Sequence, residues 1–583
     1  AMTLTLAAVF APISFVGGLT GKLFSEFALT LAGAGFISGI VALTLSPMRC
    51  SRVLTSHDQQ GRFAAWLDQG FTRLTTNYRK LLDHCLLNRG AVLLFSAVIL
   101  MSLPVLFTIT QEELAPEEDT GYFYVMAEQP QYANLRYINY FLDEIVGIWK
   151  DIPEVSHSWQ ISSPEFIFGG LSLIPWEERE RGQAEVQAEF QKRLGEVAGL
   201  EVFSFAEPGL PGSDAGLPVS FVVASTASYD EIMRVGDELL AAARESGLFI
   251  FINQTLEFSR PEIQVNVERE RAARLGISME AIGDTLAVML GESEINRFTL
   301  EGRSYKVIPQ ASRNFRLTRQ ELEKYYLRTS SGDLVPLSAV VSLENKVEPN
   351  ALTQYQQMNS TTLQGIMMPP NSVGTGLAFL RDKMREIAPP TFRDGYLGES
   401  RRFIQERASF PVLFTMAMLL IFLVLAAQFN SFRDPFVVLV TVPLSIFGAV
   451  VPLALGFATL NIYTQVGLLT LIGLISKHGI LIVEFANQLA LRGLDRREAV
   501  LQAAALRLRP ILMTTFATVL GVWPLLMASG AGAESRYSIG LTITTGMLVG
   551  TLFTLFVVPV FYLPFTRSAK AMAAVTAGEP DPA

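Results

Sequence analysis

The sequence predicts an α-helical membrane bundle of eight spans, with a large α+β region inserted on one side of it. Of the 583 residues, 50% are hydrophobic and only 17% are charged, whereas soluble domains carry about 25% charged residues. The apolar residues gather in charge-free runs. Because a bilayer-spanning helix needs about 20 apolar residues, we expect spans at about 2–17, 27–47, 90–109, 409–428, 436–455, 464–486, 510–528 and 538–562.

The distribution of charge predicts how these spans are oriented. Residues 112–407 have a net charge of −16, although the whole chain has only −9. The basic residues outside that segment cluster in 49–89, in 492–509 and in the tail after residue 566. Short loops rich in Lys and Arg stay on the cytoplasmic side. Eight alternating spans place all three basic stretches inside, so the acidic segment is expected outside.

Composition also excludes several classes of function. A nucleic-acid-binding protein would show a basic footprint, which an acidic chain lacks, so no nucleic-acid partner is expected. The two cysteines, Cys50 and Cys85, and the four histidines form no cluster with the spacing of a zinc site. We therefore predict neither a bound metal nor a cofactor.

Segment 62–86 has apolar residues at spacings of three and four, with basic residues among them. This pattern is typical of an amphipathic helix lying on the inner membrane face, and a plain cytosolic linker helix is the alternative. The first two spans also match the last two at a constant offset of 512, with Pro12 against Pro524 and Pro47 against Pro559. If this repeat is real, the chain lacks an N-terminal part with four further spans and a second exported region.

The exported segment is expected to fold as mixed α/β units. Its strand and helix patterns alternate at lengths typical of small split βαβ subdomains. The predicted strands are 122–127, 155–161, 200–205, 218–224, 262–267 and 305–309, and the predicted helices are 134–150, 183–198, 229–246, 279–290 and 376–387. A turn-rich stretch at 208–213 separates two such units.

Four phenylalanines of this segment are candidates for an aromatic binding pocket. Phe203 and Phe205 alternate, so both point to one face of a strand. Phe166 and Phe168 are expected in a loop next to Gly169 and Gly170. Such side chains could line a pocket for greasy ligands, although ordinary domain core is the alternative for both pairs.

Lys477 is the main candidate for energy coupling. It lies well within the sixth span, where a cation costs ~2.5–3.5 kcal/mol on insertion scales. A buried Lys needs an anionic partner or loses its proton. Glu484 is about 10 Å away along the helix axis, too far for a direct pair. We therefore expect the partner to come from outside this chain, and a snorkelling Lys is the alternative.

Arg507 and Thr514 share a face at the start of the seventh span. Pro510 between them fits the first turn of that helix, where its missing N–H costs nothing. Thr514 is expected either to join a polar network or to bond its own backbone. Arg507 is equally consistent with an interfacial anchor on the cytoplasmic side.

Several stretches resemble the resistance–nodulation–division (RND) efflux pumps of Gram-negative inner membranes, in the hydrophobe/amphiphile branch. They are 114–121 (LAPEEDTG), 465–469 (QVGLL), 473–486 (GLISKHGILIVEFA) and 507–514 (RLRPILMT). The resemblance covers essentially the whole chain and runs from the fifth to the twelfth family span.

This resemblance implies a secondary transporter rather than an enzyme. It implies a homotrimer in which small hydrophobic drugs leave as protons enter, with a periplasmic adaptor protein and a TolC-like outer-membrane channel as partners. Residues matching Lys477, Arg507 and Thr514 form the family's proton relay, together with an Asp pair of a fourth span that this chain lacks. Porter subdomains would cover 112–270 and 356–407 and a docking subdomain 271–355. Phe203 and Phe205 match the porter phenylalanines, but the loop after Gln160 is shorter than in the family.

Three rival functions remain as alternatives. A metal-ion exporter of the same fold would need soft ligands outside the membrane, and Met367 and Met368 form the only adjacent pair there, with Met358 nearby. A membrane enzyme would need a nucleophile or metal motif, but His478, the only histidine within a span, has none around it. A signalling receptor would need a cytoplasmic output domain, and the 18 residues after Phe565 are too short for one.

Overall fold

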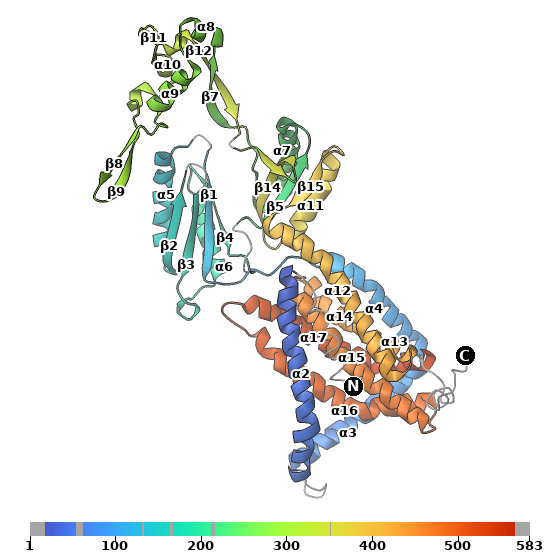
Figure 1. Ribbon diagram of the computed structural model, residues 1–583. Coiled ribbons are helices and arrows are strands. Elements are labelled where there is room, and N and C mark those ends of the chain that lie inside the picture. Colours follow the sequence, from blue (N-terminus) through green and yellow to red (C-terminus); the bar gives the residue numbers. More distant parts are fainter. Residues whose placement is uncertain are drawn as a thin grey trace.

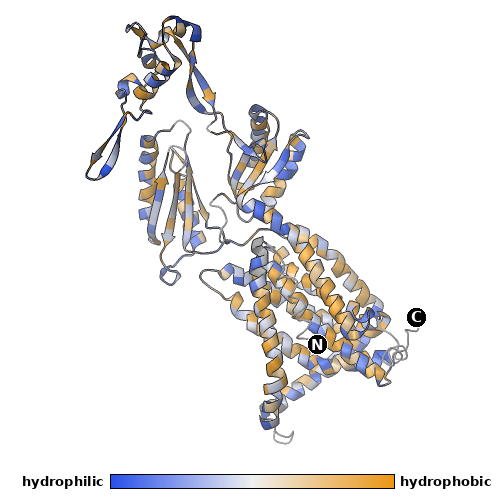
Figure 2. Cartoon of the chain, in the orientation of Figure 1, coloured by the Kyte–Doolittle hydropathy of each residue, from blue (hydrophilic) through white to orange (hydrophobic). Residues whose placement is uncertain are grey.

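The computed structural model describes residues 18–53, 62–130, 133–163, 167–210, 216–349 and 351–565. It comprises a bundle of long helices and a set of α/β units beyond one end of the bundle (Figure 1). Apolar residues dominate the bundle helices, whereas the α/β units are mixed (Figure 2). The bundle helices are α2 (Gly18–Val53), α4 (Arg89–Ile109), α12 (Gly398–Phe429), α13 (Arg433–Leu439), α14 (Thr441–Ala454), α15 (Ile462–Leu491), α16 (Arg496–Leu526) and α17 (Ala533–Phe565).

In the described part of the chain, seven helical segments are long and apolar enough to cross a membrane, with α13 and α14 together forming one of them. They coincide with seven of the predicted spans, and the remaining one, 2–17, lies outside the described residues. The helices extend beyond their apolar runs. This makes the expectation for Pro510 wrong, because α16 begins at Arg496 and Pro510 lies well inside it. An apolar run marks only the part of a helix suited to hydrocarbon, whereas backbone hydrogen bonding continues into water.

The last helix, α17, forms the centre of the bundle and packs against α14, α15 and α16. Glycines allow this close approach. A Cβ atom at Gly550 of α17 would lie 1.9 Å from Oγ of Ser445 in α14, and one at Gly448 would lie 2.4 Å from Cβ of Val549. Small residues are a common means of packing membrane helices tightly, because no side chain separates the two backbones.

The predicted amphipathic segment is a helix, α3 (Arg62–Leu87), as expected. Its buried face carries Tyr78, whose hydroxyl donates a hydrogen bond of 2.6 Å to the carbonyl oxygen of Leu555 in α17. Ion pairs also join α3 to the N-terminal half of α16. They are Arg79–Glu498 at 2.8 Å, Asp83–Arg497 at 2.7 Å and Asp68–Arg509 at 3.0 Å. The helix is thus fixed to α16 and α17 at their ends opposite the α/β units (Figure 1).

The first α/β unit is an antiparallel sheet in the order β2-β3-β1-β4, with two helices packed on it. Its elements are β1 (Tyr122–Glu128), α5 (Leu135–Lys150), β2 (Val155–Ser162), β3 (Ile167–Leu173), α6 (Gln183–Leu194) and β4 (Glu201–Ala206). Helix α6 ends at Leu194, earlier than the predicted 198. The core of this unit includes Phe123, Leu171 and Phe190, each fully buried.

The second unit repeats this arrangement. In its sheet, β14 pairs with β5 and β6, and β5 also pairs with β15. The resulting order is β6-β14-β5-β15. Its elements are β5 (Val219–Ser225), α7 (Tyr229–Glu245), β6 (Phe249–Gln254), the short β13 (Thr353–Tyr355), β14 (Met358–Met367), α11 (Val373–Ile387) and β15 (Arg393–Tyr396).

A third, outer unit is inserted between β6 and β14. It is connected through an antiparallel ladder of β7 (Arg260–Val267) and β12 (Val341–Glu348). Beyond the ladder are α8 (Arg269–Arg274), α9 (Met279–Leu290), the hairpin β8 (Asn296–Leu300) and β9 (Arg303–Val307), α10 (Arg319–Leu322), β10 (Tyr326–Arg328) and β11 (Leu334–Pro336). This unit has its own small hydrophobic core and lies farthest from the helix bundle (Figure 1).

Candidate functional site

Lys477 lies near the middle of α15 and is partly buried within the bundle. Among the residues that the structure describes, no carboxylate forms an ion pair with it, and this includes Glu484 on the same helix. The neighbours of Lys477 in α15, Ser476 and His478, are almost fully buried. The ammonium group is therefore attached to a tightly packed part of the helix and has no described counter-charge.

The residue next to Lys477 connects three helices by hydrogen bonds. One ring nitrogen of His478, Nε2, lies 3.2 Å from Oγ1 of Thr514 in α16. The other, Nδ1, lies 3.4 Å from Oγ1 of Thr551 in α17. Thr551 in turn lies 2.9 Å from Oγ1 of Thr515. This arrangement links α15, α16 and α17 at the depth of Lys477.

Arg507 of α16 makes a second contact with α15, away from His478. Its guanidinium carbon lies 4.6 Å from the ring centroid of Phe485, which is a cation–π distance. Its Nε is buried and finds no hydrogen-bond partner within the described ranges. The guanidinium of Arg507 therefore packs against a side chain of α15.

The structure thus brings α15 and α16 together both at Thr514 and at Arg507. Within the described chain, however, no hydrogen bond or ion pair joins Lys477, Arg507 and Thr514 directly. The connection to Thr514 passes through His478. Sequence reasoning missed His478 and Thr551 because a single histidine without a motif gives little signal. A threonine in a helix can also satisfy its hydroxyl on its own backbone.

A second polar network lies where α13 begins. Asp434 is only 6% exposed. Nδ2 of Asn487 in α15 lies 3.3 Å from Oδ2 of Asp434, and the hydroxyl of Tyr562 in α17 donates to Oδ1 of Asn487 at 2.8 Å. The sequence offered one signal for this site, an acidic residue between two apolar runs. Its partners could be recognised only from the packing.

The aromatic candidates of the first α/β unit largely meet. Phe203 and Phe205 lie on the same face of β4, as predicted, and belong to one cluster with Leu217 and with Phe251 of the second unit. The rings of Phe203 and Phe251 are stacked with their centroids 3.7 Å apart. Both predicted residues are at most 7% exposed. They pack the first unit against the second in this conformation.

Phe168 joins the same cluster, but the loop predicted around it is wrong. Phe168 lies in β3, within the sheet. The glycines that suggested a loop instead make room for large neighbours, since a Cβ at Gly170 would lie 1.8 Å from the hydroxyl of Tyr122. Phe166, the fourth candidate, lies outside the described residues.

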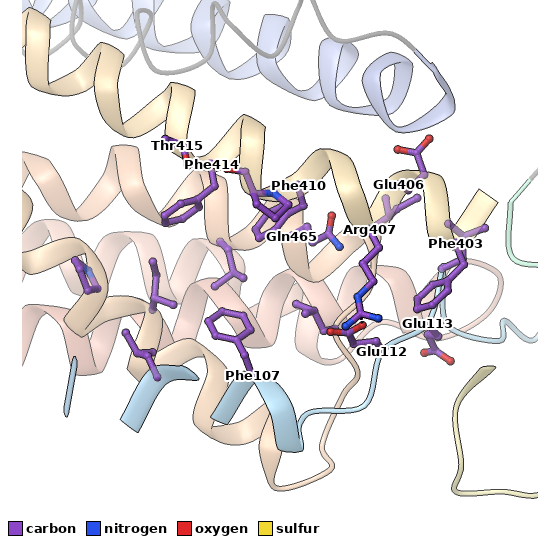
Figure 3. Close-up of a pocket in the computed structure, with 18 residues that line it drawn as sticks. Phe107, Glu112, Glu113, Phe403, Glu406, Arg407, Phe410, Phe414, Thr415 and Gln465 are labelled. Carbon is purple, nitrogen blue, oxygen red and sulfur yellow. Dashed lines mark hydrogen bonds and ion pairs between the residues drawn. The ribbon is translucent and has the colours of Figure 1, made fainter. Parts of the chain in front are cut away.

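An apolar cavity of about 510 Å³ lies between α4, α12, α14 and α15, at the end of the bundle nearest the α/β units. Phenylalanines line much of it, including Phe107 and Phe410 (Figure 3). At its mouth, Arg407 of α12 forms an ion pair of 2.8 Å with Glu112. The sequence gave no sign of this cavity, because its lining comes from four separate helices.

The methionines that would serve a metal exporter do not form an open group. Met367 is 8% exposed and packs in the hydrophobic core, whereas the adjacent Met368 is 42% exposed. Across the described residues, no group of three or more His, Cys, Asp or Glu side chains could hold a metal ion.

Comparison with known proteins identifies the family. Residues 1–566 match the model of the AcrB/AcrD/AcrF family. Similar proteins include an uncharacterized transporter of Haemophilus influenzae, 40% identical over 96% of this chain and 55% of the relative. They also include the multidrug/solvent efflux pump membrane transporter MepB of Pseudomonas putida, 31% identical over 96% and 55%, and the multidrug export protein AcrF of Escherichia coli K12, 30% identical over 98% and 57%.

The chain therefore spans about half the length of the curated relatives that it matches. The match extends through the α/β units as well as the helix bundle, since it is continuous from residue 1 to residue 566. Together with the apolar helices, it describes a multi-pass membrane protein. The chain belongs to the AcrB/AcrD/AcrF family of RND efflux transporters.

Proposed function

We propose that this chain works in a pump that exports hydrophobic and amphiphilic drugs, driven by the proton-motive force, in a Gram-negative inner membrane. The observation that carries the proposal is Lys477, a cation within a membrane helix with no carboxylate partner in the described chain. Such a residue is costly in lipid and is therefore a functional candidate by default. In a proton-driven pump, titrating carboxylates supplied by the rest of the protein would be its partners.

The coupling step follows from electrostatics. Ionised carboxylates attract the Lys477 ammonium, and their protonation removes that attraction. The helix that carries Lys477 then shifts, and packed interfaces convert such a shift into a discrete rearrangement. The hydrogen bonds of His478 to Thr514 and Thr551 support this reading, because they would transmit the shift from α15 to α16 and α17.

The substrate class is supported by two apolar sites. The cavity between α4, α12, α14 and α15 opens beside the acidic mouth at Glu112 and has the size of ordinary ligand pockets. The cluster of Phe168, Phe203 and Phe205 lies between the first and second α/β units. Separation of those units would expose its aromatic faces to a greasy ligand. Two relatives carry names that describe multidrug export or multidrug and solvent efflux.

We extend the proposal to the whole assembly. The α/β units with strand orders β2-β3-β1-β4 and β6-β14-β5-β15 are split βαβ porter subdomains (112–270 and 356–407), and the outer unit (271–355) is the docking subdomain. The protein has an eighth span at 2–17, forms a homotrimer, and works with a periplasmic adaptor protein and an outer-membrane channel similar to TolC. Helix α3 lies on the inner membrane face through its exposed apolar stripe of Trp66, Leu67, Leu74 and Leu81.

The test is drug resistance in a pump-deficient strain that expresses the full-length transporter. Lys477→Ala should abolish resistance to hydrophobic drugs without lowering the amount of protein in the membrane. Purified protein in proteoliposomes should likewise lose drug-dependent proton movement. Lys192→Ala, which removes an exposed cation of α6, is the matched control and should pump normally. Full resistance in the Lys477→Ala strain would reject the proposed role.

A further inference from the structure

The segment that joins α4 to β1, residues 110–121, is held by several elements at once. Its backbone runs beside the loop before α15, with hydrogen bonds of 2.8 Å from Leu460 N to Gln111 O and 3.1 Å from Ile462 N to Leu114 O. Glu112 forms its ion pair with Arg407 of α12. The connector, as we call residues 110–121, is therefore fixed to the membrane helices before it enters the first α/β unit.

Glu118 binds the first turn of α17. Its carboxylate accepts hydrogen bonds from the backbone N–H of Ser535 at 2.7 Å and from that of Glu534 at 3.2 Å, and also from the Ser535 hydroxyl. These N–H groups are among those that a helix cannot satisfy internally. The Glu118 side chain is 7% exposed. A buried carboxylate on a helix N-terminus is favourable both as a hydrogen-bond acceptor and toward the helix dipole.

The next residue, Asp119, binds the first α/β unit. Asp119 forms an ion pair of 2.9 Å with Arg179, whose side chain is 2% exposed, and accepts 2.9 Å from the backbone N–H of Gln183 at the start of α6. Although burial acts to raise it, the hydrogen bonds from Gln183 and Arg179 hold the pKa of Asp119 below its ordinary value. Two adjacent carboxylates thus bind the bundle and the first α/β unit, respectively.

The helix that Glu118 holds also carries Thr551, which bonds to His478 beside Lys477. Thr551 lies 16 residues after Ser535 in one continuous helix, which is roughly 24 Å at 1.5 Å per residue. We propose that Glu118 is the positioning residue through which α17 moves the first α/β unit, with Asp119 as its anchor in that unit. This inference rests on the proposed pumping function. It identifies the contact that would couple movement of the membrane helices to the first α/β unit.

The test compares Glu118→Ala, Glu118→Gln and the control Glu117→Ala in the full-length transporter, purified and placed in proteoliposomes with a pH gradient. Glu117 is the exposed neighbour of Glu118. We expect Glu118→Ala to lower the maximal rate of drug transport at least tenfold, while the KM and the Kd for the drug change less than twofold. Proton entry that depends on Lys477 should persist without transport. The Glu117→Ala variant should match the wild type.

A double variant tests whether Glu118 acts through α17. Ser535→Ala removes the hydroxyl donor and should slow wild-type transport two- to threefold, but should have no further effect in the Glu118→Ala background. If Glu118→Ala folds poorly, Glu118→Gln carries the same test with an expected three- to tenfold loss.

Wild-type rates in the Glu118 variants would overturn the inference, and so would a rate loss with an equal loss of drug binding. A wild-type protein that moves no drug would instead reject the proposed function.

Discussion

Close packing of α17 against α14 makes a prediction about two glycines that the sequence alone could not distinguish. Replacing Gly550 with Ala places a Cβ 1.9 Å from Oγ and 2.7 Å from Cβ of Ser445. The Ser445 hydroxyl already donates to the carbonyl oxygen of Thr441 at 3.0 Å, so turning it away would break a buried hydrogen bond. The two helices must therefore move apart.

The control is Gly521 of α16, where an added Cβ would meet no described atom within 4 Å. Both changes replace a helical glycine with alanine, which favours a helix by about 1 kcal/mol. This gain cancels when the two variants are compared. What remains is the cost of overpacking at Gly550, roughly 1–3 kcal/mol. We expect Gly550→Ala to be destabilised relative to Gly521→Ala by that amount.

The assay is thermal unfolding of the full-length transporter in detergent, followed by tryptophan fluorescence and by the fraction that remains monodisperse. A unit of 150–250 residues shifts its melting temperature by about 2–4 °C for each kcal/mol. Equal melting temperatures for the two variants would refute the claim that Gly550 of α17 lies directly against Ser445 of α14. Lower stability in Gly521→Ala alone would refute it more strongly.

Three further predictions concern other parts of the chain. Burial raises the pKa of Glu113 to about 7, so the folded protein holds the carboxyl proton more tightly than the unfolded chain does. The bound proton therefore stabilises the fold. This contribution is complete below about pH 4.5 and is lost as the pH rises through 7. Thermal melts from pH 4 to 8 should show a smaller loss of stability in Glu113→Gln than in the wild type, and identical profiles would contradict the prediction. Phe203→Ala and Phe251→Ala should be combined in a double-mutant cycle, with the stability of the α/β units measured by their resistance to proteolysis. The coupling energy between the two rings should be about 0.5–1.5 kcal/mol, and strictly additive effects would show that the rings do not stack. Asn461 is fully buried and caps α15. Asn461→Ala should lower the free energy of unfolding by about 0.5–2 kcal/mol, and an unchanged melting temperature would show that the cap does not stabilise the helix.

The sequence predicted the membrane helices well, because lipid makes a simple demand on composition. A long charge-free run has few alternatives to a spanning helix, and each predicted span from 27 onward coincides with a helix. The ends were less predictable. Helix α16 begins at Arg496 because charged residues continue a helix in water as readily as a loop. The first turn predicted at Pro510 was wrong for that reason.

In the α/β units, alternating patterns located six of the strands that the structure describes but missed others, among them β6 and β14. Glycine misled the prediction around Phe168. Gly169 and Gly170 suggested a loop, whereas in β3 Gly170 leaves space for the side chains of Tyr122 and Trp159, and Gly169 lies close to the backbone oxygen of Trp159. Glycine in a strand marks either a turn or a close neighbour, and only the packing distinguishes the two. The stacking of Phe203 on Phe251 was not foreseen for a different reason, because the two residues lie in separate α/β units and meet only where those units pack together.

The candidate relay shows what local sequence can and cannot identify. Lys477 was found because the cost of a charge in lipid depends only on its position within a span. His478, Thr551 and Asn487 were not found, because their hydrogen bonds cross between helices far apart in sequence. The roles of Lys477, Arg507 and Thr514 stay predictions until transport is measured.

The outer unit is attached in a way that makes it separable. Two paired strands, β7 and β12, connect it to the second α/β unit. The first residue of β7, Arg260, lies opposite the last residue of β12, Glu348. The β6 and β14 strands on either side pair directly with each other. The entire outer unit could thus be removed and the two cut strands joined by a short turn. It could also be exchanged for the outer unit of a relative. Neither change would alter the strand order of the sheet from which the unit extends. Evolution and protein engineers could use the same junction to exchange one outer module for another while keeping the membrane machinery unchanged.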